Sequence, residues 1–484
     1  MSEELSANEY RQQRIENMER LEEAGYPAYG GAFERSDRLD RLHEQFELDK
    51  PVRACGRIVA MRKMGKLAFA HLNDGSARFQ LMIQRDVIGE DAFKAFKLLD
   101  LGDCIGVEGT FFLTKTEENT IAVKEWTLLS KSLLPLPEKF HGLSDVETRY
   151  RQRSLDLISN PEVMELFKKR SAVIREIRAY LDERDFLEVE TPMLQQLAGG
   201  ATAKPFQAHY NALNVDVFLR IAPELYLKRL IVGGMDRVYE VNRNFRNEGI
   251  DRTHNPEFTC LEIYQAYGDM RSMQVLIQGL FLHVAERVFG KTVFEWMGHE
   301  IDLGSPWREV SYTDLICEHL GADWFAKDEA AMRAIAEQRE VGLEESMGPR
   351  EITHEIYDKT IENSLIQPTF ITRLPAELVP LANACTDDPT LVDVFELVIG
   401  GKEIAPAYSE LNNPLEQRDR FEAQAAGDAS KVDQDFLTAL EVGMPPTGGM
   451  GIGIDRLMML LTGSDAIRDV ILFPQLKPRS KASE

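Results

Sequence analysis

The chain has 484 residues, more than a single hydrophobic core normally supports, so we expect at least two domains. Hydrophobic residues make up 44% of the chain, as in ordinary globular proteins, and this excludes disorder on a large scale. The formal net charge of −24 excludes a chain that binds polyanions over its whole surface, although a local basic surface can still bind nucleic acid.

The sequence indicates no membrane partner, because no apolar run approaches the roughly 20 residues that span a bilayer. The charged N-terminus also lacks a secretory core, so we expect a cytoplasmic protein. The five cysteines are widely spaced and form no CxxC pair, which predicts reduced thiols and no zinc site.

Residues 1–50 form a predicted helical extension, in which Ile15, Met18 and Leu21 recur at helical spacing. Residues 51–133 contain short, alternating strand-like runs with glycine turns, a pattern typical of a small β-barrel. Five basic residues and no acidic one lie between Pro51 and Ala70; by itself this run is better interpreted as a solvated charged face. A segment with two prolines begins a predicted linker over 134–154.

Residues 155–484 predict a large α+β domain. An amphipathic helix over 161–184 leads to a strand from Glu188 to Thr191. Two further strands are expected over 236–247 and 256–266, and a hairpin around Gly400-Gly401. A glycine-rich strand then enters an apolar helix at 451–462.

The strand over 256–266 carries the first candidate site. Alternation places Phe258, Cys260, Glu262 and Tyr264 on one face, and the apolar residues between them on the other. An unpaired carboxylate on such a surface is costly, so Glu262 either pairs with an internal basic residue or awaits a cationic ligand. Taken alone, the residue favours the structural pair.

The loop between the strands over 236–247 and 256–266 carries the second candidate site, with Arg246, Glu248, His254 and Asn255 at one end of the sheet above Phe258. A guanidinium beside an aromatic ring and a histidine suits a planar, anionic ligand such as a nucleotide. An exposed, charged hairpin tip explains the same residues equally well.

The hairpin at Gly400-Gly401 carries the third candidate site. A two-residue turn pairs residue 398 with 403 and residue 396 with 405, so Glu396 and Glu403 share a face. Two carboxylates on one face repel unless a cation lies between them, and magnesium shared with substrate phosphates is the natural candidate. Simple alternation sends Glu410 to the opposite face, but a one-residue bulge at Pro406 would bring it back.

The strand at 447–453 lacks side chains at Gly451 and Gly453, so a flat ligand can approach its backbone, and Arg456 opens the helix that follows. Glycines at such a place usually mark a turn; the arginine at the junction is what favours a binding site.

These clusters resemble the three signature motifs of class II aminoacyl-tRNA synthetases, which are read in order at 186–192, 245–258 and 451–456. The barrel in front is similar to the anticodon-binding OB-fold of the subgroup that charges aspartate, asparagine and lysine. The runs at 199–201, 220–228 and 408–412 resemble the lysyl-tRNA synthetases within it, and the likeness extends from about residue 53 to 478.

The resemblance implies a fold and an activity. The fold would be α+β, with an N-terminal OB-fold barrel and a catalytic domain built on an antiparallel sheet flanked by helices. The activity would be a lysine–tRNA ligase reaction, in which L-lysine and ATP give lysyl-adenylate and the lysyl group then passes to the 3′ end of tRNA(Lys). A homodimer is implied by the first motif, and about three Mg²⁺ ions per active site by the family as a whole.

The resemblance also assigns roles to residues. Arg246 and Arg456 would be catalytic, and Phe258 and Arg456 would sandwich adenine, with Glu248, His254, Asn255 and Glu396 completing the ATP site. Glu396 and Glu403 would hold magnesium. The lysine site would comprise Gly200, Glu224, Glu262, Tyr264, Tyr408 and Glu410. The anticodon would be read by Phe69 and Gln80, with Arg57 as a weaker candidate.

Two departures from the family pattern lie near this site. Pro406 stands where many relatives have an asparagine that touches the amino acid, and residues 379–383 replace a more common Ser-Pro-Leu-Ala-Lys/Arg run. Rival readings are an aspartyl- or asparaginyl-type synthetase, a lysyl ligase that modifies elongation factor P, and a catalytically dead tRNA-binding paralogue. Glu262 and Glu410 argue against the aspartyl- or asparaginyl-type synthetase, and the barrel argues against the lysyl ligase. The intact phosphate-handling residues argue against the catalytically dead paralogue.

Overall fold

The computed structural model describes residues 2–137, 143–201, 203–425, 428 and 431–478. It divides into two compact units, residues 1–165 and 166–484. Residues 138–142 of the predicted linker lie outside the described residues, as do Met1 of the predicted extension and residues 479–484 of the predicted catalytic domain.

The first unit contains a closed barrel with strand order β1-β2-β3-β5-β4, which confirms the predicted OB-like domain. Ala68, Ala70 and Leu72 of β2 are fully buried in the barrel core, whereas Phe69 and His71 between them face outward. The strands are β1 (Pro51–Met64), β2 (Leu67–Asn73), β3 (Arg78–Gln84), β4 (Cys104–Leu113) and β5 (Asn119–Ser130). The helices are α1 (Ser2–Glu23), α2 (Leu39–Glu44), α3 (Arg85–Ile88), α4 (Glu90–Phe96), α5 (Val146–Arg151) and α6 (Arg153–Ser159).

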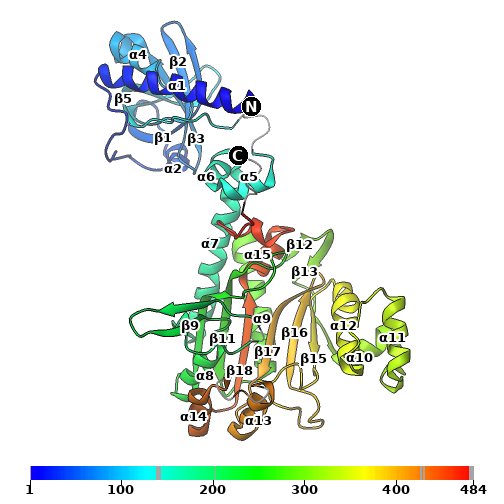
Figure 1. Ribbon diagram of the computed structural model, residues 1–484. Coiled ribbons are helices and arrows are strands. Elements are labelled where there is room, and N and C mark those ends of the chain that lie inside the picture. Colours follow the sequence, from blue (N-terminus) through cyan, green and yellow to red (C-terminus); the bar gives the residue numbers. More distant parts are fainter. Residues whose placement is uncertain (1, 138–142, 202, 426–427, 429–430, 479–484) are drawn as a thin grey trace. The chain divides into compact units, whose positions relative to one another are not determined.

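The second unit is built on an eight-stranded sheet with the order β14-β15-β16-β17-β18-β11-β10-β6 (Figure 1). The pairs β14–β15 and β10–β6 are parallel and the other neighbours antiparallel, so the predicted α+β class with an antiparallel sheet is confirmed. The strands are β6 (Leu187–Glu188), β10 (Arg237–Phe245), β11 (Glu257–Ala266), β14 (Arg308–Ser311), β15 (Thr369–Thr372), β16 (Val394–Ile399), β17 (Lys402–Ser409) and β18 (Thr447–Gly453). Smaller sheets contain β7 (Leu194–Gln195), β8 (Gln207–Tyr210) and β9 (Val215–Leu219), and β12 (Val293–Trp296) and β13 (His299–Asp302).

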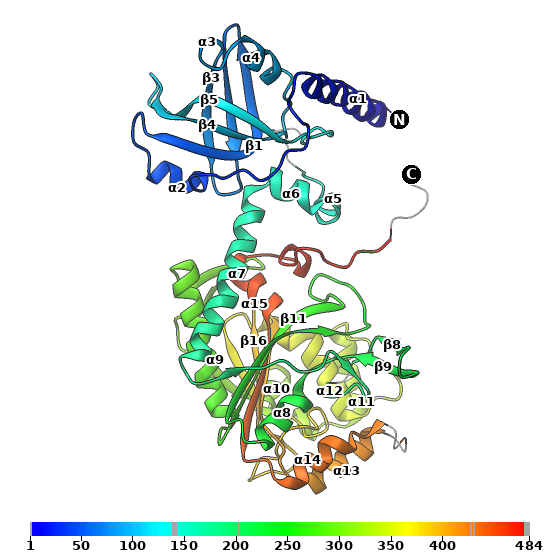
Figure 2. The same ribbon diagram turned by 90° about the vertical axis from the view of Figure 1, so that its left-hand side faces the viewer.

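One face of the large sheet is covered by α7 (Pro161–Asp182), α9 (Met270–Val284) and α15 (Ile454–Thr462) (Figure 2). Leu261 and Ile263 of β11 are fully buried in this layer, as alternation predicts. The opposite face is partly covered. At one end of the sheet it packs against α8 (Glu224–Val232) and α14 (Gln434–Val442), and at the other against α10 (Tyr312–Leu320) and α12 (Pro349–Ile356). The remaining α-helices are α11 (Glu329–Gln338) and α13 (Pro414–Ala425).

The strand predicted from Glu188 to Thr191 is much shorter in the structure, where β6 comprises only Leu187 and Glu188 and forms one edge of the large sheet. Val189 continues its contact through one backbone hydrogen bond to Tyr239. All five cysteines are free. Within the described part of the chain, none of the helices is both long and apolar enough to cross a membrane.

Candidate active site

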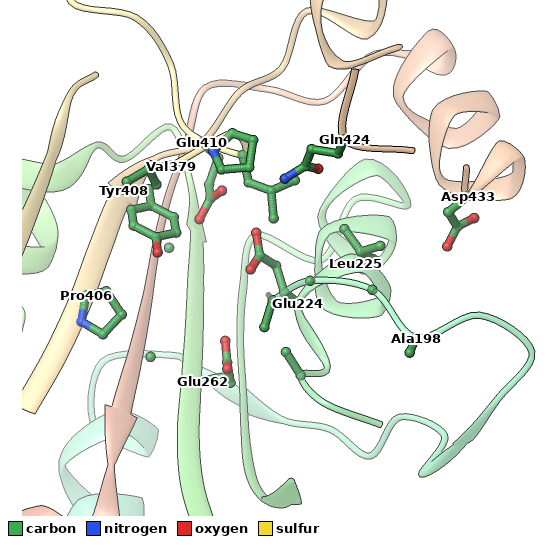
Figure 3. Close-up of a pocket in the computed structure, with 18 of the residues that line it drawn as sticks. Ala198, Glu224, Leu225, Glu262, Val379, Pro406, Tyr408, Glu410, Gln424 and Asp433 are labelled. Carbon is green, nitrogen blue, oxygen red and sulfur yellow. The ribbon is translucent and has the colours of Figure 1, made fainter. Parts of the chain in front are cut away.

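A cavity of about 360 Å³ opens on the face of the large sheet that α8 and α14 leave partly uncovered. Its floor is set by strand register: Glu262 pairs with Gly451, and Gly449 pairs with both Tyr264 and Tyr408. Directly paired residues point to the same face, so the side chains of β11 and β17 converge over the bare glycines of β18. Figure 3 shows Glu262, Tyr408 and Glu410 around this hollow.

A β-bulge in the β16–β17 hairpin decides which residues of β17 face the cavity. Val398 pairs with Glu403 as predicted, but Glu396 pairs with Pro406, so the predicted pairing of 396 with 405 is wrong. The extra residue lies between Glu403 and residue 405, before Pro406 rather than at it. The consequence is nevertheless the predicted one, because Glu403, Pro406 and Glu410 all line the cavity.

Three buried carboxylates face the cavity from three different elements. Glu224 begins α8, Glu262 lies in β11 and Glu410 follows β17; their exposed fractions are 6%, 8% and 1%. Burial, with the nearby charge of Glu224, raises the pKa of Glu262 to about 8. Burial also raises the pKa of Glu410 to about 8. Such carboxylates are short of positive charge, which suits a cationic ligand.

Internal neutralisation of this acidic group is partial. No arginine pairs with Glu262 or Glu410 among the described residues. Glu262 accepts a hydrogen bond on Oε2 from the Tyr264 hydroxyl at 3.0 Å and a weaker one on Oε1 from the Cys260 thiol at 3.9 Å. A lysine, however, does pair with Glu410: the fully buried Nζ of Lys228 contacts Glu410 Oε2 and lies 2.6 Å from Glu224 Oε1. Glu410 is therefore partly neutralised by the protein itself, whereas Glu262, for which the sequence alone favours a structural pair with a basic residue, has no such pair among the described residues.

A second acidic group lies on the same face, where Glu396 and Glu403 lie beside Glu362. Glu362 belongs to a short 3₁₀ turn (Glu362–Ser364), and its Oε1 accepts a hydrogen bond of 2.9 Å from the backbone nitrogen of Glu403. Burial, reinforced by Glu403, raises the pKa of Glu396 to about 8 and that of Glu362 to about 7. In the described chain neither of these two pairs with a basic side chain, so their charge fits a bound cation.

The predicted nucleotide residues lie at the end of β10 and β11. The guanidinium of Arg246 lies 5.2 Å from the ring centre of Phe258, and its buried Nε has no hydrogen-bond partner. Arg456 donates to the backbone oxygen of Glu403 at 2.6 Å, and its other terminal nitrogen lies 3.2 Å from His254 Nε2. Arg246, not Arg456, therefore lies over Phe258 here, so the predicted sandwich of Phe258 and Arg456 requires a planar ligand between them.

Two comparisons with known proteins decide the family. A model of class II tRNA synthetases (D, K and N) matches residues 145–477, and one of OB-fold nucleic acid binding domains matches residues 52–129. A lysine–tRNA ligase of Syntrophomonas wolfei is 50% identical over 99% of both chains. The lysine–tRNA ligase of Pelotomaculum thermopropionicum is 50% identical and matches 98% of this chain and 96% of its own. That of Lactococcus lactis is 48% identical and matches 99% of this chain and 100% of its own. The chain belongs to the class II lysine–tRNA ligase family.

In this member of the lysine–tRNA ligase family, the cavity gathers the residues predicted for lysine together with Arg246 and Glu403. Gly200 belongs to this lining, and its φ of 85° explains the glycine. The rest of the predicted ATP set lies outside the cavity lining: Glu248, His254, Asn255, Phe258, Glu396 and Arg456. Of these, Asn255 is already engaged, since it donates to the backbone of Glu257 at 2.5 Å and accepts from Gln475 at 3.3 Å.

The barrel of the first unit brings the predicted anticodon residues to one outer face. Phe69 pairs with Met82 and Gln80 with His71 across β2 and β3, and the Gln80 amide donates to Thr120 at 2.9 Å. Arg62 of β1 lies directly opposite Phe69, whereas the weaker candidate Arg57 pairs farther along with Asn73. The guanidinium of Arg57 also donates to the backbone oxygen of Gly102 at 2.7 Å.

Sequence reasoning missed three residues of these sites: Lys228, Glu362 and Arg62. Lys228 belongs to the run at 220–228 that resembles the family, and its spacing of four residues from Glu224 looks like an ordinary helix pair. Glu362 carries no readable signal, because it lies in an irregular turn. Arg62 could have been found by counting along β1 only if the bulge between Ile58 and Ala60 had been known.

Proposed function

We propose that this protein activates L-lysine with ATP, giving lysyl-adenylate and pyrophosphate, and then transfers the lysyl group to the 3′ end of tRNA(Lys). The observation that carries the proposal is the cluster of Glu224, Glu262 and Glu410 in one cavity with Arg246. A free lysine has two ammonium groups and a carboxylate, and these are the charges that such a cavity complements. An aspartate- or asparagine-charging pocket would instead need a basic or neutral polar group where these carboxylates lie.

We assign the ends of lysine by position. Glu224 and Gly200 would meet the α-ammonium, and Glu262, Tyr264 and Glu410 the ε-ammonium, with Tyr408 packing beside the side chain. Pro406 and Val379 line the same cavity, so neither position offers a side-chain hydrogen bond to the amino acid. The contact that an asparagine makes at position 406 in relatives would here be absent or made by water.

The reaction requires no nucleophile from the protein. The carboxylate of lysine attacks the α-phosphorus of ATP, the bond to the bridging oxygen of the β-phosphate breaks, and pyrophosphate leaves. Arg246 lines the cavity and its buried Nε has no hydrogen-bond partner, so its guanidinium would hold the attacking carboxylate and the α-phosphate together. The protein then contributes by positioning and by stabilising the charge that develops on phosphate oxygens.

The remaining ATP contacts follow from the same end of the sheet. Phe258 and Arg456 would enclose adenine once Arg246 turns to the phosphate, and Glu248, His254 and Asn255 would complete the site. His254 is held by Asp251, whose carboxylate lies 2.8 Å from Nδ1, so Nε2 points toward Arg456. The catalytic assignment therefore comprises Arg246 and Arg456.

Divalent metal use is expected of this family, and the residues present fit it. Glu396 and Glu403 would hold Mg²⁺, which neutralises the charge of the ATP phosphates when bound. In the described residues, no three His, Cys, Asp or Glu side chains form a complete metal site by themselves, so phosphate oxygens would supply the missing ligands. About three ions per active site remains the family-based expectation.

For the tRNA, we assign residues 51–133 as the anticodon-binding domain, with Phe69 stacking on a base and Gln80 hydrogen-bonding to one. Arg62 opposite Phe69 is a better basic partner for such a base than Arg57. In the same proposal, residues 1–50 are an N-terminal extension, 134–154 a linker and 155–484 the catalytic domain.

A homodimer is supported by exposed apolar residues around the first motif. Leu187, Met193 and Leu194 are 53%, 46% and 53% exposed, and β6 leaves an open sheet edge. The five free cysteines suit the cytoplasm, the compartment we propose.

The function is tested by ATP–pyrophosphate exchange with each of the twenty amino acids, followed by charging of tRNA(Lys). We expect exchange with lysine alone and transfer to tRNA(Lys). Exchange with aspartate or asparagine would contradict the assignment. Absence of any exchange would favour a catalytically dead paralogue. Exchange without transfer to tRNA would favour a lysyl ligase with a protein acceptor.

A further inference from the structure

Lys228 is a fully buried ammonium that bridges two elements across the wall of the cavity. It lies one helical turn after Glu224 in α8, and it also reaches Glu410 beyond the end of β17. An ion pair with Glu224 in the same helix would by itself neutralise the Lys228 ammonium, so the contact with Glu410 requires another explanation. Burying an ammonium is costly, and apolar residues often replace buried ion pairs without loss of stability.

Three of the carboxylates that line the cavity are assigned to the ammonium groups of lysine. When ionised, Glu224, Glu262 and Glu410 contribute three negative charges, and Lys228 offsets one of them. Within this set two negative charges remain, which equals the number of ammonium groups on a free diamino acid; the other charged residues of the lining, Glu403, Lys431 and Asp433, are not part of the set. Arg246, on the same cavity, is left for the carboxylate of the amino acid.

The geometry leaves one oxygen of each bridged carboxylate for a ligand. Lys228 contacts Oε1 of Glu224 and Oε2 of Glu410, so these two carboxylates are held one ammonium apart. Both oxygens of Glu410 are buried without a hydrogen-bond partner; Oε2 forms the ion pair with Lys228, and Oε1 lies beside the bare backbone of Gly449. Oε2 of Glu224 is not engaged by Lys228. The distance between Glu224 Oε2 and Glu410 Oε1 therefore depends on the Lys228 ammonium, which joins the other oxygen of each carboxylate.

We propose that Lys228 is a positioning residue that sets the distance between the two ammonium-binding carboxylates and thereby selects the side-chain length of the diamino acid. This inference rests on the proposed function, since it assumes that Glu224 and Glu410 bind opposite ends of lysine. Without the bridge, Glu224 and Glu410 repel each other, and the separation of their ligand oxygens is no longer fixed.

The test compares lysine with ornithine, which is one methylene shorter, in ATP–pyrophosphate exchange by the full-length wild type and by Lys228→Met. Methionine keeps the length of the side chain and removes the charge. We expect the preference for lysine over ornithine to fall at least about ten-fold in kcat/KM, the lower end of what one methylene contributes in a fitted pocket. The lysine KM should rise, while the ATP KM stays within about two-fold.

Lys131→Met is the matched control. Lys131 is also a fully buried lysine between two carboxylates, those of Asp100 and Asp103, but it lies in the first unit. Its loss should lower the melting temperature and leave the lysine–ornithine preference unchanged. An unchanged preference in Lys228→Met, or an equal loss in both variants, would overturn the inference. A wild type without lysine-dependent exchange would overturn the proposed function instead.

Lys228→Arg covers the case in which Lys228→Met does not fold. Arginine keeps the buried positive charge but holds the two carboxylates farther apart with its wider fork. We expect the lysine KM to rise at least about ten-fold with the ATP KM unchanged, since a fork that displaces the carboxylates misplaces the ammonium contacts. A lysine KM equal to that of the wild type would contradict the role of Lys228 as a spacer.

Discussion

Gly449 and Glu410 lie so close together that a side chain at position 449 has no room beside the carboxylate. A Cβ added to Gly449 would lie well inside contact distance of Glu410 Oε1 and only 2.5 Å from Cε1 of Tyr264. Both groups are buried and belong to the proposed lysine site, so neither can move aside without changing that site.

Gly449→Ala should therefore reduce kcat/KM for lysine at least about one hundred-fold, because overpacking forces off-rotamer side chains in the wall of the cavity. Gly451→Ala is the comparison, since a Cβ there would meet Glu262 Oε1 at an ordinary 3.5 Å. We expect this second variant to keep the melting temperature of the wild type. Steady-state kinetics and thermal melts distinguish the two, and equal lysine kinetics for Gly449→Ala and the wild type would contradict the assigned site.

Lysine binding should release protons. Burial holds the pKa of Glu262 and of Glu410 at about 8 in the empty cavity, so both are mostly protonated at pH 7. An ammonium beside a carboxylate favours its ionised form, so the bound pKa falls and lysine affinity rises as pH increases from 6 through 8. The empty protein should also lose stability as the pH rises from about 4.5 to about 8, because over that window these carboxyls are ionised in the unfolded chain but still protonated in the folded one.

Calorimetry at pH 7 in buffers of different ionisation enthalpy should give about one to two protons released per lysine bound. Glu262→Gln should lower that number, since it removes one titrating group. A binding enthalpy that is independent of the buffer, or lysine affinity that is constant from pH 6 to 8, would be inconsistent with the raised pKa values.

Arg246→Ala should abolish lysine-dependent pyrophosphate exchange, with a loss of at least about one thousand-fold, because it removes the donor that would bridge the attacking carboxylate and the α-phosphate. Arg243→Ala is the control on the same strand: Arg243 points to the other face and pairs with Glu257 at 3.5 Å. Near-normal exchange in Arg246→Ala would remove this arginine from the mechanism.

Phe69→Ala in the barrel should raise the KM for tRNA(Lys) about ten- to one hundred-fold, because stacking of a base on an aromatic ring is lost. Pyrophosphate exchange without tRNA should be unchanged. Arg62→Ala should weaken tRNA charging more than Arg57→Ala, since Arg62 lies opposite Phe69 and Arg57 is tied to Gly102. The reverse order would return Arg57 to the base-contacting role.

The alternation of β11 could be predicted from the sequence, because its apolar and polar residues follow a strict period of two. Leu261 and Ile263 accordingly lie in the helix-covered core, and Glu262 and Tyr264 face the cavity. The Gly400-Gly401 turn was equally readable, since both residues adopt the positive φ that favours glycine.

The phase of β17 could not be fixed in the same way. A proline suggested the bulge, but the extra residue lies between Glu403 and residue 405, and nothing in the local sequence marks it. Lys228 and Glu362 were inaccessible for a different reason. Their roles arise from contacts with residues 182 and 41 positions away in the chain, Glu410 and Glu403, which only the folded structure brings together.

The central claim, that buried carboxylates in this cavity bind the ammonium end of lysine, is tested most directly by calorimetric titration of lysine and of ATP into Glu410→Gln. We predict that lysine affinity falls at least about thirty-fold, as expected when one partner of a buried charge pair is removed. ATP affinity should stay within about two-fold of the wild type. Equal losses for both ligands, or lysine affinity unchanged, would contradict the claim.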